Sequence, residues 1–272
     1  MTKSTAAAAA LRMRRNIIQL AWRAGAKGAH LAPSLSIADI MAVLYTRVLN
    51  IDPGNPEWPD RDRFLLSKGH GALGCYVAMY EAGVISEEDL YSFETEGGCF
   101  PGQPSKHLSK GIEYSGGSLG LGLSYGAGLA LSARLNGADY RTYVLMGDGE
   151  LNEGSVWESV MFAKQQGLSN LTAIVDRNNM QSDGFCCSII GCDVESIWRG
   201  YGWEVVCCDG HDPEALEEAL KTNDIGNPKV VIAGTVKGKG ISFMENAPEW
   251  HHGRLTEEQY KNAMSELSGG DA

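Results

Sequence analysis

Short apolar segments that alternate with helix-like stretches constrain the fold of this chain most strongly. Four segments are apolar on both faces of a possible strand: Arg141–Met146, Leu171–Val175, Trp203–Cys208 and Lys229–Val236. Stretches long enough to cross over a sheet separate them, which is typical of βαβ units. Strands that are apolar on both faces are covered by helices on both sides. The sequence therefore predicts an α/β fold in which helices flank a parallel sheet.

Helical periodicity indicates the segments that would cover this sheet. Apolar residues recur at helical spacing in Ala6–Ala24, Ser36–Leu49, Gly71–Ala82, Ser86–Phe93, Leu119–Leu135, Ser155–Gln166, Asp212–Lys221 and Thr256–Leu267. One long segment, Glu94–Gly117, is rich in Gly, Pro, Ser and His instead. A loop of that length inside a compact domain is usually functional or disordered, and its position before a glycine-rich helix favours a functional loop.

Composition limits the partners of the chain. The 272 residues carry a net charge of -11, which argues against a nucleic-acid or anionic-membrane surface. No apolar stretch approaches the length of a membrane span. An anionic ligand stays possible, because a local field or a metal ion can override the total charge.

The N-terminus and the cysteines bear on location. Residues 1–38 contain no Asp or Glu but several Arg, which fits either an organelle transit peptide or an exposed, alanine-rich first helix with Ile17, Ile18 and Ala21 on one face. We favour the helix. The seven cysteines form neither a disulfide framework nor a zinc pattern, so we expect free thiols in a reducing compartment and a cytoplasmic protein.

Polar residues end two of the predicted strands. Asp148 stands between Gly147 and Gly149 after the first strand, and Asn178 follows the second strand 30 residues later. Ligands of open parallel sheets lie at this carboxyl edge. Neither residue alone would exclude a turn or capping role. Together, Asp148, the side-chain carbonyl of Asn178, a nearby backbone carbonyl, two diphosphate oxygens and a water form an octahedral set for Mg²⁺.

Several motifs then point to one family. "GDGELNEG…DRNN" resembles the diphosphate-binding motif of thiamine-diphosphate enzymes. "GAHLAPSLSIADIMAVLY", "DRFLLSKGHGALGCY", "PGQP", "GGSLGLGLSYGAGLAL" and "TVKGKGISFMENAPEWHHG" are similar to transketolase motifs, in the order of that family. The resemblance runs from about Lys27 to Gly253 and implies the thiamine-diphosphate-binding (PP-type) fold. It also implies a metal-dependent transferase of carbohydrate metabolism that moves a two-carbon ketol unit from a ketose phosphate to an aldose phosphate.

The resemblance assigns roles to particular residues. Asp148, Asn178 and the backbone carbonyl of Met180 would bind Mg²⁺, while Gly147 and Gly149 would approach the diphosphate of thiamine diphosphate. Gly117 and Leu119 would lie against its aminopyrimidine ring. Glu153 would support the cofactor at the subunit interface, unless it is only a carboxylate at a helix start. The histidines that face the substrate would be His30, His70 and one of His251 or His252.

Histidine suits such a site because imidazole titrates near neutral pH and both donates and accepts hydrogen bonds. Two positions depart from the family pattern. Gln103 stands in "PGQP" where the family has a histidine, so it can bind a substrate hydroxyl but cannot shuttle a proton, and His107 is a possible substitute. Ser182 stands where an apolar residue usually packs near the thiazolium ring. Gln103 therefore leaves room for a branched or modified donor sugar.

The length of the chain sets the last expectation. A full transketolase is more than twice as long, and its second domain supplies the activating glutamate and the pyrimidine pocket. We therefore expect an N-terminal subunit that is active only with a separate pyrimidine-binding subunit, in a heterotetramer. The domains would be a helical segment (1–26), the cofactor-binding domain (27–253) and a C-terminal helix and tail (254–272). Alternatives are a subunit of a deoxyxylulose-phosphate synthase or 2-oxoacid dehydrogenase, and a non-catalytic partner that keeps the fold.

Overall fold

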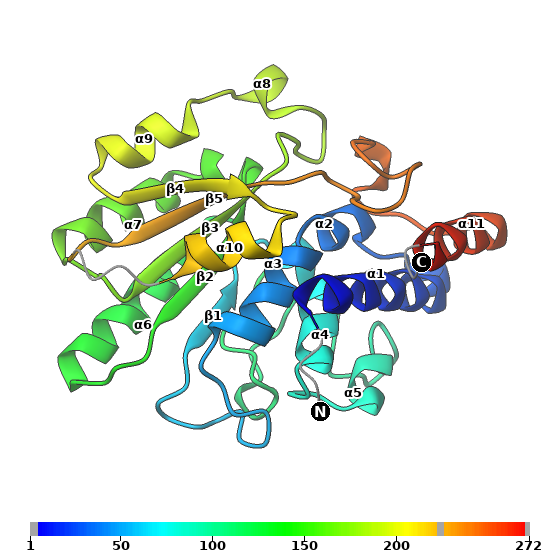
Figure 1. Ribbon diagram of the computed structural model, residues 1–272, viewed down its shortest axis with the longest axis horizontal. Helices are drawn as coiled ribbons and strands as arrows, with labels where there is room; N and C mark the ends of the chain where they lie inside the picture. The colour runs from blue at the N-terminus through cyan, green and yellow to red at the C-terminus, as the bar shows by residue number, and fades with distance from the viewer. Residues whose placement is uncertain (1–4, 222–225, 270–272) are drawn as a thin grey trace.

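A five-stranded parallel sheet forms the centre of the molecule (Figure 1). The computed structural model describes residues 5–221 and 226–269. The strands lie in the order β1-β2-β3-β5-β4. Their bounds are Arg63–Leu66 (β1), Thr142–Gly147 (β2), Leu171–Arg177 (β3), Glu204–Asp209 (β4) and Lys229–Gly234 (β5). The predicted parallel sheet is confirmed.

Helices cover both faces of the sheet, which explains why its strands are apolar throughout. On β2, Tyr143 and Leu145 pack into one hydrophobic cluster, whereas Val144 and Met146 pack into the other. Successive side chains of a strand point to opposite faces. The first cluster is shared with α1 (Ala6–Arg23), α2 (Leu31–Ser36), α3 (Ala38–Val43), α4 (Ala72–Glu81), α10 (Pro213–Leu220) and α11 (Glu257–Ser268), and the second with α6 (Gly122–Asn136), α7 (Gly154–Gln165) and α9 (Val194–Gly200). Two apolar layers therefore enclose the sheet, as the sequence predicts.

The helices mostly follow the predicted periodicity. Their bounds are Ala6–Arg23 (α1), Leu31–Ser36 (α2), Ala38–Val43 (α3), Ala72–Glu81 (α4), Glu87–Tyr91 (α5), Gly122–Asn136 (α6), Gly154–Gln165 (α7), Cys186–Ile189 (α8), Val194–Gly200 (α9), Pro213–Leu220 (α10) and Glu257–Ser268 (α11). Short helical turns lie at Gly25–Lys27, Leu44–Val48, Gly69–Gly71, Leu108–Lys110, Gly149–Asn152 and Pro248–Trp250. Glu94–Gly117 is a loop apart from one of these turns.

Some elements escape the sequence patterns. The strand β1 carries no clear sequence signal, because only four residues pair with β2 and the first of them is an arginine. The helices α8 and α9 are short and lie in the crossover between β3 and β4. The predicted helix Ser36–Leu49 is broken at Ile37, which separates α2 from α3.

The helix α1 begins at Ala6 as predicted, but it is part of the core rather than an exposed helix. Its alanines Ala6, Ala9 and Ala10 are buried together with Ile17 and Ile18. It packs against α3, α4 and α11, so its small side chains allow close helix contacts. Residues 1–4 and 270–272, which include the end of the predicted C-terminal tail, lie outside the described part of the chain.

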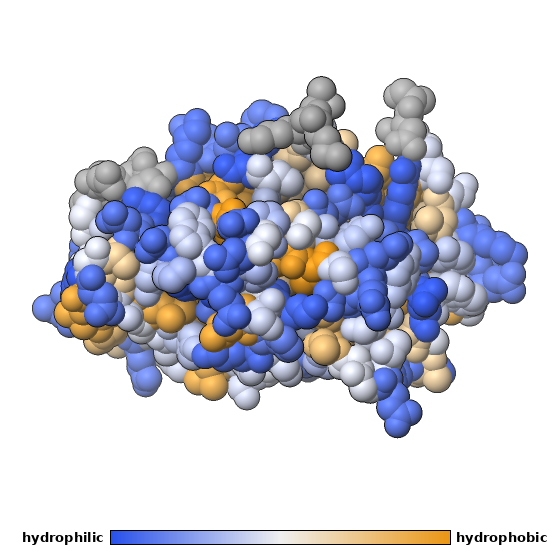
Figure 2. All heavy atoms as spheres, turned by 90° about the horizontal axis from the view of Figure 1, so that it is seen from below, coloured by the Kyte–Doolittle hydropathy of each residue, from blue (hydrophilic) through white to orange (hydrophobic). Residues whose placement is uncertain are grey.

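The surface is mixed. Figure 2 shows hydrophilic side chains interleaved with smaller apolar clusters on one face. Within residues 5–221 and 226–269, no helix has both the length and the apolar composition for a bilayer crossing. All seven cysteines are free thiols.

A buried ionic network joins α1 to the segments that follow β4 and β5. The guanidinium of Arg14 on α1 donates to both carboxylate oxygens of Asp39 on α3, at 3.2 and 2.5 Å. His211 Nδ1 lies 2.7 Å from Asp39 Oδ2, and His211 Nε2 accepts from the backbone N–H of Val236 at 2.8 Å. Burial by itself would raise the pKa of Asp39, but the hydrogen bond from His211 and the charge of Arg14 hold that pKa below its usual value.

We predict that Asp39→Asn destabilises the chain by about 3 kcal/mol at pH 7, because removing one partner leaves a buried guanidinium uncompensated. Urea unfolding of the purified chain measures the loss. The carboxylate has a lowered pKa in the folded state, so its stabilisation is full above the unfolded pKa of about 4 and is lost as pH falls through the folded pKa. The difference between wild type and variant should therefore shrink in acid.

The matched control is Glu257→Gln, which removes the exposed pair between Glu257 and Lys261. This change should cost less than about 0.5 kcal/mol. Equal losses for the two variants at pH 7 would contradict a stabilising role for the buried network.

Candidate active site

A cavity of about 410 Å³ opens at the carboxyl edge of the sheet. The turns after β2 and β3 form one side of it, and loops that precede α4 and α11 form the other. The sequence-predicted residues that line it are His70, Leu119, Gly147, Asp148, Gly149, Glu153, Asn178, Met180 and His251. The structure therefore brings most of the predicted site residues together at one place.

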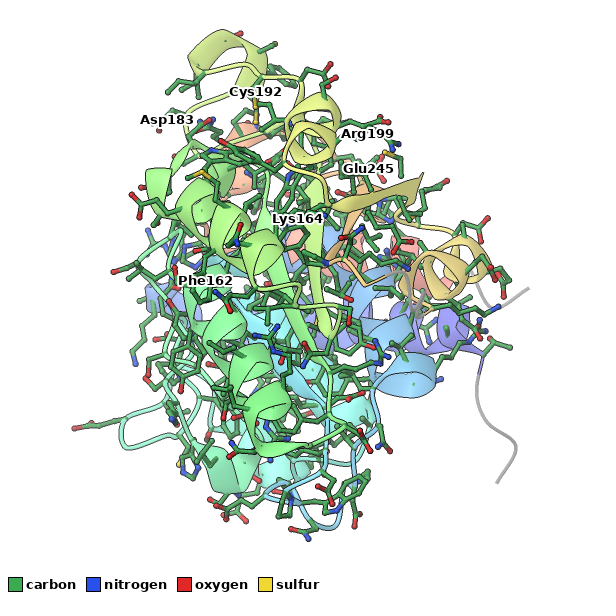
Figure 3. All side chains as sticks on the ribbon, turned by 90° about the vertical axis from the view of Figure 1, so that its left-hand side faces the viewer. Phe162, Lys164, Asp183, Cys192, Arg199 and Glu245 are labelled. Atoms are coloured by element: carbon green, nitrogen blue, oxygen red, sulfur yellow. The ribbon has the colours of Figure 1, made fainter. Side chains whose placement is uncertain are left out.

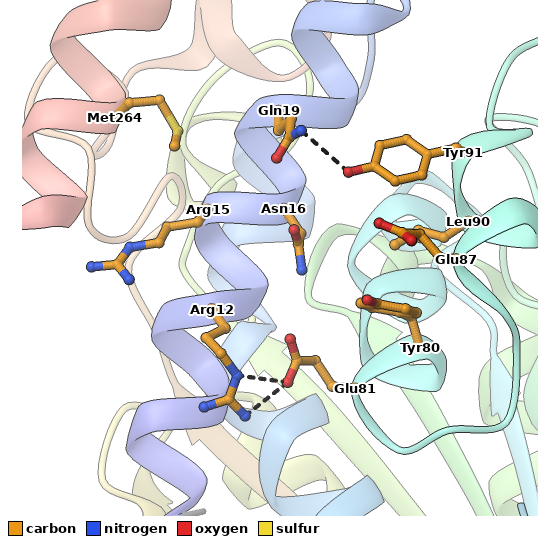
Figure 4. A pocket seen from close by; sticks show the side chains of 10 residues that line it. All are labelled: Arg12, Arg15, Asn16, Gln19, Tyr80, Glu81, Glu87, Leu90, Tyr91 and Met264. Atoms are coloured by element: carbon orange, nitrogen blue, oxygen red, sulfur yellow. Dashed lines mark hydrogen bonds and ion pairs between the residues drawn. The ribbon is translucent and has the colours of Figure 1, made fainter.

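A second cavity, of about 620 Å³, lies elsewhere between α1, α4, α5 and α11 (Figure 4). Its walls are side chains such as Arg12, Gln19 and Tyr91, and they interact mainly with one another. Arg12 pairs with Glu81, and Gln19 donates to the Tyr91 hydroxyl at 3.2 Å. It contains none of the predicted catalytic residues, so size alone does not identify the site.

Asp148 lies directly beside the end of β3. The register pairs Gly147 with Asp176, so the two turns start at the same level. Asp148 is 5% exposed, and its carboxylate accepts the backbone N–H of Gly149 at 2.8 Å and that of Asn179 at 2.5 Å. Burial, followed by the nearby charge of Asp176, raises the pKa of Asp148. A cation at this carboxylate would offset both effects.

The turn after β3 is held in an unusual backbone conformation. Asn179 has a φ of 62°, a left-handed conformation that asparagine tolerates better than most residues. Asn178 is buried, and its Oδ1 accepts the backbone N–H of Met180 at 3.1 Å. Met180 in turn pairs with Phe185 across a short bridge. This turn places Asn178 and Met180 on the cavity wall beside Asp148.

The oxygen atoms of this site would bind a hard cation only together with oxygen atoms from a bound ligand. Among the described residues, no three His, Cys, Asp or Glu side chains gather as a metal site. The predicted set contains one carboxylate, one amide oxygen and one backbone carbonyl, and all three are the oxygen ligands that Mg²⁺ prefers. Mg²⁺ commonly completes such a partial set with phosphate oxygens and water. The chemistry of these residues therefore fits a metal-bound diphosphate.

Two buried lysines supply positive charge that the sequence patterns do not assign. Lys68 and Lys237 are 1% and 3% exposed, and both line the cavity. Lys68 Nζ lies 2.5 Å from Asp176, and Lys237 Nζ donates to the carbonyl of Gln181 at 3.0 Å. Burial and the charge of Lys68 lower the pKa of Lys237 to about 8. In a chain with a net charge of -11, these lysines place positive charge beside the carboxylates of Asp148 and Glu150 on the same cavity wall.

Both lysines lie in motifs that the sequence displays, namely "SKGH" and "TVKGKG". The motifs do not reveal that these lysines are buried, because a lysine in a glycine-rich segment ordinarily extends into water. Glu150 is a further buried group, and it follows the "GDG" motif. Its carboxylate accepts from the Ser67 hydroxyl and from the backbone N–H groups of Gly120 (2.8 Å) and Gly147 (3.2 Å). It therefore ties the glycine-rich loop to the end of β2.

Four histidines gather beside the lysines. The ring centroids of His30 and His70 are 6.1 Å apart, and His251 lies 5.5 Å from His30 and 5.2 Å from His70. His252 is exposed and lies 4.6 Å from His30. Of the histidine doublet, His251 lines the cavity and its Nδ1 is 3.0 Å from Lys237 Nζ. The structure therefore places His251, and not His252, on the cavity wall.

The protonation of these histidines differs from the expectation. Burial, with the charges of His252 and the two lysines, lowers the pKa of His30 to about 4. Burial and Lys237 lower the pKa of His251 to about 3, and burial with Lys68 lowers the pKa of His70 well below its usual value. The expectation of titration near neutral pH is therefore wrong for His30, His70 and His251. These three imidazoles are neutral at pH 7, with one nitrogen to donate and one to accept.

Three other residues that the sequence singled out, Gln103, Gly117 and His107, do not line the cavity. Gln103 packs against Gly69, next to His70, and its Oε1 is buried with no hydrogen-bond partner in the described part of the protein. Gly117 has a φ of 121°, which favours glycine, and precedes Leu119 on the wall. Glu153 is exposed at the N-terminal cap of α7, on the rim. His107 bonds Ser109 on its own loop and does not line the cavity.

Comparisons with known proteins agree with this geometry. The family model described as "Transketolase, thiamine diphosphate binding domain" matches residues 8–270. The chain is 42% identical over 257 residues to an apulose-4-phosphate transketolase subunit of Actinobacillus succinogenes, covering 94% of this chain and 93% of that protein. It is 40% identical over 243 residues to the 6-deoxy-6-sulfo-D-fructose transketolase subunit SqwG of a Clostridium strain, covering 88% of each.

Solved structures show the same fold. Transketolase from Leishmania mexicana superimposes with a TM-score of 0.89 at 30% identity, covering 97% of this chain and 41% of that one. The enzyme from Campylobacter jejuni gives a TM-score of 0.87 at 30% identity, covering 97% and 42%. The chain therefore spans about two fifths of the length of these solved transketolases. With a family model that matches nearly all of it, the chain belongs to the transketolase family, as its N-terminal, thiamine-diphosphate-binding part.

Proposed function

We propose that this chain is the N-terminal subunit of a two-subunit transketolase. It would transfer a two-carbon ketol unit from a ketose phosphate to an aldose phosphate with thiamine diphosphate and Mg²⁺. The observation that carries this proposal is the cavity that joins Asp148 and Asn178 to a histidine cluster. Its matches include curated transketolase subunits of nearly its own length.

The chain's own residues would hold the diphosphate end of the cofactor. Asp148, Asn178 and the Met180 carbonyl supply oxygen ligands to Mg²⁺, and the turn of Gly147 and Gly149 lets phosphate oxygens come close. Lys237 and Lys68 offset the remaining negative charge. Gly117 and Leu119 border the place for the aminopyrimidine ring. When bound, thiamine diphosphate supplies the electron sink for breaking and forming the carbon–carbon bond.

The histidines would act on the sugar. A neutral imidazole accepts a proton from a hydroxyl at one nitrogen and donates a hydrogen bond from the other. His30, His70 and His251 converge from three loops, so a substrate between them meets several such groups at once. His252 is exposed, and its ring lies 4.6 Å from that of His30.

A separate subunit would complete the site. Curated relatives of nearly the same length are named as transketolase subunits, and the solved transketolases are more than twice as long as this chain. An apolar face of α6 and α7 carries Leu121, Tyr125, Met161 and Phe162, each at least 37% exposed. Figure 3 shows Phe162 on the outer side of the molecule. Glu153 and the exposed Ile189 and Ile190 line the cavity itself. A separate pyrimidine-binding subunit fits here, in a cytoplasmic heterotetramer.

The donor sugar is expected to be specialised. Relatives are named for apulose 4-phosphate and for 6-deoxy-6-sulfo-D-fructose. The Oε1 of Gln103 is buried beside Gly69 with no hydrogen-bond partner among the described residues, and a hydroxyl of the donor sugar would satisfy it. We therefore propose a branched or modified ketose phosphate as the donor.

Activity should depend on the partner. The purified chain, given thiamine diphosphate, Mg²⁺ and sugar phosphates, should show no ketol transfer. The complex co-purified with the product of the neighbouring reading frame should be active and contain two copies of each chain by light scattering. Full activity from the 29.3 kDa chain alone would contradict the two-subunit reaction.

Cofactor binding should depend on the metal carboxylate. Asp148→Ala in the assembled complex should weaken Mg²⁺-dependent cofactor binding by about 100-fold or more, since even outer partners of a metal site cost 10–100-fold. Quenching of tryptophan fluorescence during Mg²⁺ titration measures this. Asp193→Asn, an exposed helix cap on α9, should leave the titration unchanged. Unaltered binding in Asp148→Ala would refute the metal assignment.

Donor choice should depend on Gln103. Gln103→His should raise kcat/KM for ordinary pentose-phosphate donors relative to the native donor by about 10-fold, because a hydrogen-bonding group selects between sugars that differ in one hydroxyl. Gln103→Ala is the control and should lower activity with every donor. An unchanged donor ratio in Gln103→His would exclude Gln103 as a specificity residue.

A further inference from the structure

Asp176 is the most deeply buried charged group beside the active site. It lies at the end of β3 and is 0% exposed. Its Oδ2 accepts from Lys68 Nζ at 2.5 Å, from the Ser36 hydroxyl at 2.7 Å and from Asn178 Nδ2 at 3.1 Å. Its Oδ1 accepts from the Thr235 hydroxyl. One carboxylate thus collects four side-chain donors, although no sequence motif assigns it a role.

The four donors belong to segments that carry the site. Ser36 ends α2, the helix that begins directly after His30. Lys68 stands two residues before His70, and Thr235 two residues before Lys237. Asn178 is the remaining donor and one of the proposed metal ligands. Asp176 therefore lies where the three loops meet the turn after β3.

The amide of Asn178 is the group most dependent on this contact. The oxygen and nitrogen of an asparagine amide have nearly the same shape, so only hydrogen-bond partners decide which atom faces which way. A carboxylate that receives four donors acts as an acceptor and holds Nδ2 toward itself. On the opposite side, the backbone N–H of Met180 holds Oδ1 at 3.1 Å. If the amide were rotated by 180°, Oδ1 would face the Asp176 carboxylate and Nδ2 would face the N–H of Met180, so neither hydrogen bond could form.

We propose that Asp176 is a positioning residue that fixes the Asn178 amide with its Oδ1 available to the metal and its Nδ2 turned away. The inference rests on the proposed function, because it assumes that Asn178 binds Mg²⁺. It adds that the second metal ligand depends on an acceptor two residues earlier in the chain. The spacing D-x-N places both groups on one side of the strand end, since residues i and i+2 of a strand share a face.

The test is Asp176→Asn in the complex with the partner subunit. An asparagine at 176 has nearly the same shape, but it can offer either an amino group or an oxygen to Asn178, so the orientation is no longer set. At saturating thiamine diphosphate, the Mg²⁺ concentration for half-maximal cofactor binding should rise 10–100-fold, the usual effect of losing an outer partner of a metal ligand. Tryptophan fluorescence gives this value without any measurement of activity.

Two control variants separate an effect on the orientation of the Asn178 amide from an effect on the stability of the complex. Ser36→Ala and Thr235→Val each remove one donor from the same carboxylate without touching the amide. They should lower the thermal unfolding temperature of the complex but leave the Mg²⁺ titration within about threefold of wild type, because the Asp176 carboxylate stays an acceptor for Asn178 Nδ2 after either change. A weakening in these controls as large as that in Asp176→Asn would overturn the proposal.

A double variant tests the orientation itself. In Asp176→Asn with Asn178→Asp, residue 178 is a carboxylate that presents an oxygen whichever way it turns. Mg²⁺ dependence should return to within about tenfold of wild type. The cycle with the single Asn178→Asp variant isolates the coupling between the two positions from the added charge. Additive effects in this cycle would refute the proposal. If Asp176→Asn does not assemble, the double variant decides alone. A Mg²⁺ concentration for half-maximal cofactor binding more than about tenfold above that of wild type would then overturn the proposal.

The same titrations distinguish a failure of the positioning role of Asp176 from a failure of the proposed function. If the wild-type complex binds thiamine diphosphate without any need for Mg²⁺, the metal assignment itself fails. If the wild type needs Mg²⁺ and Asp176→Asn needs it equally, the assignment stands and only the positioning role of Asp176 is lost.

Discussion

The parallel pairing of β2 with β3 is the interaction on which the site depends. Its register sets Gly147 opposite Asp176, so the turns that follow begin at the same height. A shift by one residue would turn the apolar side chains of one strand to the wrong layer, and both layers are buried. The hydrophobic core therefore fixes the register, and the register brings Asp148 beside Asn178.

Charge balance governs the cavity beyond these two turns. Asp148 and Asp176 are buried near Lys68 and Lys237, and an uncompensated buried charge would be costly. Asp176 pairs with Lys68, and Asp148 lies 3.5 Å from the guanidinium of Arg177, so a bound ligand at this cavity would need both a cation for Asp148 and an anion for Lys237 to keep the charges balanced. A magnesium diphosphate carries both. Burial, with a smaller contribution from the two lysines, lowers the pKa of His30 and His70, so at neutral pH these imidazoles are uncharged hydrogen-bonding groups.

Sequence patterns predict the parts of this site that have a local signature. Asp148 and Asn178 end apolar runs, and His70 and His251 lie in recognisable motifs, so their meeting at one cavity, with His30 and His252 beside it, could be expected. The strand β1 could not, because its four residues gain their β-structure from pairing with β2. Nor could Asp176 and Lys237, whose importance comes from deep burial, a property of the assembled layers that no short motif records.

The proposed function requires that the turns after β2 and β3 hold thiamine diphosphate through a magnesium ion. A crystal structure of the assembled complex, grown with thiamine diphosphate and Mg²⁺, would show whether they do. We expect a metal within bonding distance of Asp148, Asn178 and the Met180 carbonyl, with two of its ligands from the diphosphate. A diphosphate bound away from these turns, or a metal that contacts neither side chain, would contradict this binding mode.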